Sequence, residues 1–97
     1  MSTFVLLMNL TEQGMANIKE APARIEEAVN ALEAAGGKVL AFYTVMGLYD
    51  YISIVDAPSD QVALAQLLGL GVVGNVRTTT LKAFSREEFA EIVKMLP

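Results

Sequence analysis

A tight turn at residues 47–50, Gly-Leu-Tyr-Asp, separates two apolar runs in the middle of the chain. The runs, residues 38–45 and 51–55, are rich in β-branched and aromatic side chains, which favour strands. Glycine permits the positive φ that a sharp reversal needs, and aspartate can hydrogen-bond nearby amides. The two runs are therefore predicted to pair as antiparallel strands, and this pair fixes the middle of the fold.

A strand and a helix are predicted ahead of this pair. Residues 3–8 are apolar on both faces, which is typical of a central strand. Thr11 is placed to cap a short helical turn, and Pro22 lies near the first turn of a longer helix. That helix is predicted to end at Gly36-Gly37. Its predicted buried side consists of Ile25, Ala28, Val29 and Leu32.

A helix, a last strand and a final helix are predicted after the pair. Ser59 is the expected N-cap of the first of these helices. Its expected end is marked by Gly69, Gly71 and Gly74. Its expected buried stripe consists of Ala63, Leu64, Leu67 and Leu68. The last strand covers residues 75–84, and Ser85 with Glu88 forms the capping-box pattern of a C-terminal helix.

The order of these elements is β-α-β-β-α-β with one added helix. Right-handed crossovers turn that order into a ferredoxin-like α+β sandwich with a four-stranded antiparallel sheet and both crossover helices on one face. Residues 1–97 are predicted to form one such domain, with the first and third strands in the centre of the sheet.

The second face of this sheet is predicted to be covered by another subunit. A chain of 97 residues buries only about two-thirds of its unfolded surface, yet 54% of its residues are hydrophobic. A homodimer or higher homo-oligomer through the sheet face is therefore expected. One sheet face is predicted to carry Tyr43, Tyr51, Ser53, Thr78 and Thr80. Ser53 is expected on the contact face, so that Ser53→Arg would weaken assembly.

Charge and composition exclude several classes of function. The net charge of -4 and the pI of about 4.6 argue against nucleic acid and acidic membrane surfaces as partners. The chain has no Cys and no His, so it lacks disulfides, thiol chemistry and the commonest metal ligand and general base. No metal or cofactor is expected. No signal peptide or membrane span is apparent, which predicts a cytoplasmic protein.

Five segments of the chain match a known family in order: residues 11–14, 17–19, 47–50, 56–60 and 74–81. With these segments the chain resembles the GYD-domain family, small bacterial proteins named for a Gly-Tyr-Asp signature. Leu48 stands between the glycine and the tyrosine, so the match is to the Gly-any-Tyr-Asp form. The resemblance implies a fold of the dimeric α/β-barrel type, in which two ferredoxin-like sheets pack face to face. It implies no particular reaction.

The chain also resembles the effector-binding domain of feast/famine regulators of the leucine-responsive type. Those domains share the Gly-any-Tyr-Asp turn and a threonine-rich last strand, here residues 78–80. The chain has no room for their helix-turn-helix, and its acidity does not suit DNA. This resemblance implies an effector-sensing half that stands alone.

The candidate site lies at the central turn. Tyr49 and Asp50 are predicted to form the rim of a ligand cavity, beside a sheet face that carries Tyr43 and Tyr51. Asn17 is a further candidate ligand contact. The alternative for Tyr49 and Asp50 is a purely structural turn, and Asn17 has the alternative of a capping or solvated residue.

Three functions fit these features. The first, which the apolar sheet and the missing catalytic side chains favour, is an oligomeric protein that binds a small molecule in a cavity beside the sheet. The second is a cofactor-independent monooxygenase or isomerase, suggested by analogy with other dimeric α/β barrels. The third is a stand-alone effector-sensing or purely structural subunit.

Overall fold

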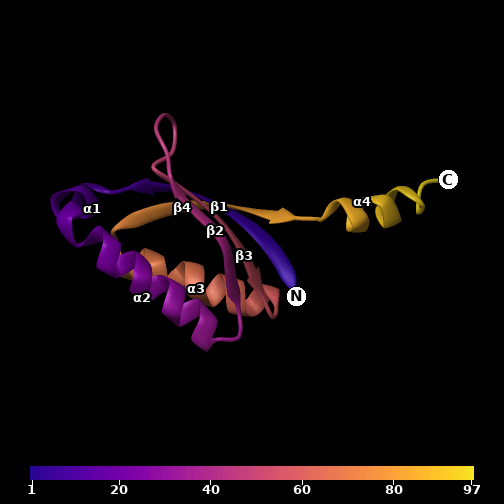
Figure 1. Ribbon diagram of the computed structural model, residues 1–97, viewed down its shortest axis with the longest axis horizontal. Coiled ribbons are helices and arrows are strands. Elements are labelled where there is room, and N and C mark those ends of the chain that lie inside the picture. Colours follow the sequence, from indigo (N-terminus) through magenta and orange to yellow (C-terminus); the bar gives the residue numbers. More distant parts are fainter.

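The computed structural model describes residues 1–97 and consists of one four-stranded antiparallel sheet in the order β2-β3-β1-β4, with two long helices on one side (Figure 1). The strands are β1 (Ser2–Leu10), β2 (Lys38–Thr44), β3 (Tyr51–Ala57) and β4 (Val76–Ala83). The helices are α1 (Glu12–Ala16), η1 (Ile18–Glu20), α2 (Ala21–Ala34), α3 (Asp60–Val73) and α4 (Arg86–Val93). This confirms the predicted ferredoxin-like α+β topology, with β1 and β3 central.

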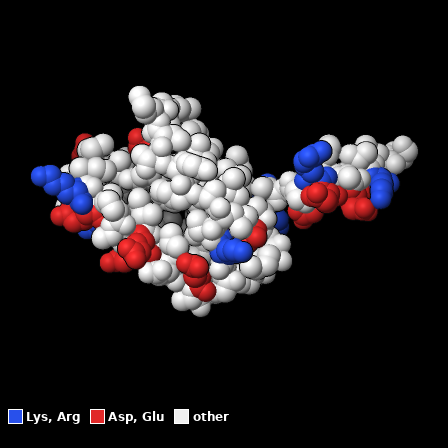
Figure 2. All heavy atoms as spheres, in the orientation of Figure 1, with Lys and Arg blue, Asp and Glu red and all other residues white.

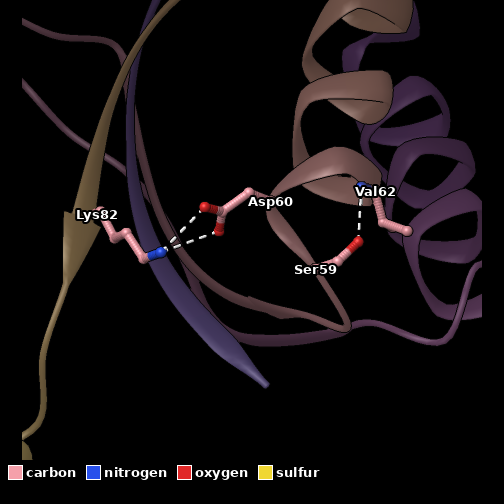
Figure 3. Close-up of polar contacts among 4 residues, drawn as sticks. All are labelled: Ser59, Asp60, Val62 and Lys82. Carbon is pink, nitrogen blue, oxygen red and sulfur yellow. Dashed lines mark hydrogen bonds and ion pairs between the residues drawn. The ribbon is translucent and has the colours of Figure 1, made fainter.

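The predicted caps position the helices. Thr11 accepts a hydrogen bond from the Gly14 amide at the start of α1, and Ser59 does the same for the Val62 amide at the start of α3. Figure 3 shows the Ser59 cap beside an ion pair in which Lys82 on β4 contacts both carboxylate oxygens of Asp60 at 3.0 and 3.1 Å. This pair is solvent-exposed, so we assign it no more than about 1 kcal/mol.

The end of α3 differs from the prediction. The helix continues through Gly69 and Gly71 and ends only at Gly74, whose φ of 86° is the left-handed conformation that a helix C-cap requires. A β-carbon at either of the two inner glycines would meet no atom within 4 Å. These two glycines therefore lie on an open part of the helix surface.

Strand pairing divides the sheet into two faces. The helix face includes Phe4 and Met8 of β1, which lie opposite Val55 and Tyr51 of β3, and all four are buried. The other face, which no helix covers, is called here the open face (Figure 1). Its apolar side chains are Val5, Leu7, Ala41, Tyr43, Ile52, Ile54 and Leu81.

Two face assignments made from the sequence are wrong. Ser53 is not on the open face: it is only 3% exposed, lies on the helix face and donates a hydrogen bond to the Ala41 carbonyl at 2.9 Å. Tyr43 does not share a face with Tyr51, because the partner of Tyr51 on β2 is Thr44, and Tyr43, one position earlier, lies on the other face. Tyr43 lies opposite Ile52 on the open face and is 66% exposed.

The predicted buried stripe of α3 is correct only in part. Ala63 is buried and Leu67 is half-buried, but Leu64 and Leu68 are exposed. The physical reason is that α3 is apolar on all sides, with no charged residue between residues 61 and 73. Hydrophobic spacing alone therefore cannot select the side that faces the sheet.

The C-terminal helix α4 projects away from the sheet (Figure 1), and every residue from Phe84 to Pro97 is exposed. Both hydrogen bonds of the predicted capping box between Ser85 and Glu88 are present. Because α4 projects in this way, the radius of gyration is 14.7 Å. A compact domain of this length has a radius of gyration of roughly 12–13 Å. No helix of the structure is both long enough and apolar enough to cross a membrane.

Candidate functional site

A cavity of about 450 Å³ lies between the helix face of the sheet and the two long helices. Its volume falls within the range of small-molecule sites, roughly 300–1,000 Å³. Hydrophobic residues make up 21 of its 29 lining residues. The sheet contributes Phe4, Leu6, Met8, Leu10, Val39, Phe42, Tyr51, Ser53 and Val55, and the helices contribute Ile25, Ala28, Val29, Leu32, Ala63, Leu67 and Leu70.

Charge is confined to the outside of the cavity. Arg24 and Glu27, both on α2, are the only charged residues that line it, and both are exposed. Burying an ion without a partner is costly, so the uncharged interior favours an uncharged, mostly apolar occupant.

Few polar groups reach the interior. The Ser53 hydroxyl is already used in its bond to the Ala41 carbonyl. Tyr51 is 5% exposed and its ring packs against Phe42 at a centroid distance of 5.4 Å. Its hydroxyl makes no hydrogen bond within the chain. Asn75 is 9% exposed, and its side-chain nitrogen Nδ2 is buried without a partner.

Asn75, the residue just before β4, is held by Thr11 and Gly14 at the start of α1. The Thr11 amide donates to the Asn75 carbonyl at 3.0 Å, and the Thr11 hydroxyl donates to the Gly74 carbonyl at 2.6 Å. A β-carbon at Gly14 would lie 2.1 Å from the Asn75 carbonyl oxygen, so only glycine fits there. These contacts join residues more than 60 positions apart and fix one end of the cavity.

The central turn supports the same end of the sheet from another side. Asp50 donates its amide to the Met8 carbonyl, and its carboxylate accepts from the Leu10 amide at 2.8 Å. Asn9 donates to the Leu48 carbonyl, also at 2.8 Å. Leu10 lines the cavity. The Asp50 carboxylate therefore helps to fix the wall of the cavity, because it holds the end of β1 in place.

Only some of the predicted site residues line the cavity. Tyr51 and Asn17 line the cavity. Tyr49 is half-buried outside it, Asp50 is bound to backbone, and Tyr43 lies on the opposite side of the sheet. Asn17 donates its side-chain amide to the Gln13 carbonyl at 3.0 Å and so also has the capping role considered for it.

Sequence reasoning missed Asn75 as a site residue. Its only signal was its place beside Gly74 in a segment shared with the family, because its contacts come from distant parts of the chain. No group of three or more His, Cys, Asp or Glu side chains in the structure is arranged to hold a metal ion.

Asp50→Ala is expected to lower the free energy of unfolding by about 1.5–3 kcal/mol, because it removes a charged acceptor from the Leu10 amide. Tyr49→Phe is the matched control. It removes a hydroxyl that makes no hydrogen bond, so its effect should stay within about 0.5 kcal/mol. Urea unfolding of the two variants measures both values. Equal losses would contradict the structural role given to the carboxylate.

Comparison with known proteins agrees with the resemblance found in the sequence. The model of the GYD domain matches residues 4–93, nearly the whole chain. The chain belongs to the GYD-domain family. A curated protein of similar sequence, from Thermus thermophilus, is 37% identical over 84 residues, which cover 86% of this chain and 88% of the relative. That relative is named glutamine synthetase and cystathionine beta-lyase binding protein.

A solved structure is similar to this GYD-domain protein in fold. It is a feast or famine regulatory protein from M. tuberculosis complexed with L-methionine, with a TM-score of 0.66 and 20% sequence identity. The match covers 88% of this chain but only 51% of the regulator, so the chain spans about half of its length. At this identity the likeness concerns the fold alone.

Proposed function

We propose that this GYD-domain protein is a self-assembling binding protein that holds a small, mostly apolar molecule between its sheet and its helices. The cavity of about 450 Å³ carries this proposal, because its interior is apolar and contains a buried polar group without a partner. A ligand would bury its own apolar surface there and fill space that side chains leave empty. Tyr51 and Asn17 are the predicted site residues that we retain as ligand contacts.

Binding is better supported than catalysis by the groups that line the cavity. A general acid or base must lie within hydrogen-bond reach of the reacting atoms. The only charged side chains that line the cavity are those of Arg24 and Glu27, and both are exposed at its outside. Interior polar groups are limited to hydroxyls and amides, which suit the orientation of a ligand.

Native mass spectrometry of the protein purified from its source cells tests the proposal. We expect the wild-type chain to carry one additional small mass that is released on denaturation. Ala28→Phe should abolish it, because the larger side chain fills space from α2 without adding charge. If the wild-type protein and the variant both show the mass of the chain alone, the proposal of a bound ligand is contradicted.

Self-assembly is supported by the surface that a single chain leaves exposed. The accessible area is 6782 Å², roughly 1,400 Å² above that of a typical folded monomer of this mass. Charged side chains gather around α1 and α2 and on the projecting α4, while much of the body between them is uncharged (Figure 2). We propose that two copies pack open face to open face, as in dimeric α/β barrels. An interface of 2,000 Å² or more in total is typical of obligate dimers.

Docking on a larger enzyme is a second candidate function. The name of the Thermus thermophilus relative gives two enzymes that it binds, and this chain carries an exposed helix surface of the kind that docks on proteins. On α3, Leu64, Leu68 and Val72 follow one another at helical spacing and are 57%, 62% and 86% exposed. Such a role fits the cytoplasmic location predicted from the sequence.

Leu64→Arg is expected to weaken binding to purified glutamine synthetase or cystathionine beta-lyase at least tenfold, because it places a charge in an uncharged contact. Ile54→Lys on the open face serves as a control for effects of assembly. Surface plasmon resonance with the immobilised enzyme gives the affinities. Binding by wild type that Leu64→Arg leaves intact would exclude this side of α3 as the docking surface.

A further inference from the structure

Asn75 presents a hydrogen-bond donor that the folded chain does not use. The residue lies just before β4, is 9% exposed and lines the cavity. Its Nδ2 is the one buried side-chain nitrogen or oxygen without a hydrogen-bond partner. Buried polar groups in folded proteins are almost always paired, so an orphan beside a cavity indicates a missing partner.

The hydrogen-bond network determines which end of the Asn75 amide is the donor. Gln13 contacts the Val73 carbonyl at 2.8 Å, and a carbonyl only accepts, so the Gln13 atom there is the nitrogen Nε2. The same Nε2 lies 3.0 Å from the Asn75 side chain, whose contacting atom must therefore be the oxygen. The nitrogen is therefore the atom without a partner, and the contacts of Gln13 fix this assignment.

The position of this donor is rigid. The backbone of Asn75 accepts from the Thr11 amide, and α1 packs so closely on it that Gly14 has no room for a side chain. The side chain is held at its oxygen by Gln13. This fixes the direction of the donor, but Nδ2 itself has less than 1 Å² of accessible surface, so neighbouring side chains must shift for a ligand atom to reach it.

We propose that Asn75 anchors the ligand of the cavity through its side-chain N–H, and that the ligand is an uncharged, mostly apolar molecule with a carbonyl-type acceptor, such as a ketone, ester or amide. This inference rests on the proposed function. A carboxylate is disfavoured because no cationic side chain lies in the interior to pair with it.

A pair of probes with the same shape tests the inference. Acetophenone carries a carbonyl oxygen where α-methylstyrene carries a methylene group, so the two differ mainly in the acceptor. By ligand-observed NMR, wild type is expected to bind acetophenone roughly 2- to 10-fold more tightly, the value of one neutral hydrogen bond. Asn75→Asp keeps the oxygen that accepts from Gln13 and removes the donor, so this preference should disappear.

Asn30→Asp is the matched control, since it makes the same change of amide to carboxylate at an exposed residue of α2 that does not line the cavity. It should keep the preference for acetophenone. A second readout needs no variant: the side-chain N–H resonances of Asn75 in wild type should shift with acetophenone much more than with α-methylstyrene.

The outcomes separate this inference from the proposed function. Equal affinities of the two probes in wild type, with no selective shift at Asn75, would overturn the anchoring role and leave a cavity that binds apolar molecules. Failure of both probes to bind would overturn the proposed function and the anchoring role together.

Discussion

Ser53→Arg is expected to unfold the domain or to lower its free energy of unfolding by roughly 3–5 kcal/mol, the cost of an uncompensated buried charge. Ser53 is 3% exposed on the central strand β3 and faces the apolar cavity. No acidic side chain lies in the interior to pair with the new guanidinium. Domains of this size are stable by only about 5–15 kcal/mol, so the loss is a large share of the total.

Ser53→Ala is the control for this change. It removes only the hydrogen bond to the Ala41 carbonyl and should cost about 1 kcal/mol. Urea unfolding followed by circular dichroism measures both variants. A Ser53→Arg protein that remains as stable as wild type but becomes monomeric would restore the face assignment first made from the sequence.

Ile54→Arg, at the next residue, is expected to leave the fold intact and to break the assembly. Its side chain lies on the open face of the same central strand and is 36% exposed. In a face-to-face dimer each arginine would be buried against apolar side chains of the other copy, and a charge in that position costs several kcal/mol. Sedimentation at micromolar concentration should therefore give the mass of one chain.

Leu64→Arg supplies a matched control for assembly, because it introduces the same charge at an exposed leucine on α3, away from the open face. That variant should sediment like wild type. An Ile54→Arg protein with the mass of wild type would show that the open face is not the interface between copies.

The contrast between Ser53 and Ile54 shows how far the sequence could predict the fold. Element order and antiparallel pairing follow from the turn at residues 47–50 and from the spacing of apolar residues. The choice of face does not, because β1 and β3 are apolar on both sides and a small polar residue such as Ser53 fits either environment. The register of β2 on β3 pairs Tyr43 with Ile52 and so puts Tyr43 and Tyr51 on opposite faces, and the alternation within either strand does not reveal that register.

The site was predictable only where its contacts are local to a motif. Asp50 was recognised as a turn residue that hydrogen-bonds amides, but its partner Leu10 lies 40 positions away. Asn75 depends on Thr11 and Gln13, which reach it from the far end of the chain. Contacts of this kind arise from tertiary packing, and no pattern in the amino-acid sequence specifies them.

A crystal structure of the protein purified from its source cells tests the central claim, a ligand held between sheet and helices, most directly. We expect electron density for a small molecule in the cavity, with an acceptor atom within hydrogen-bond distance of Asn75 Nδ2 and apolar groups against Phe4 and Tyr51. A structure in which α2 and α3 close onto the sheet, side chains fill the space and the Asn75 amide bonds to protein would contradict the account.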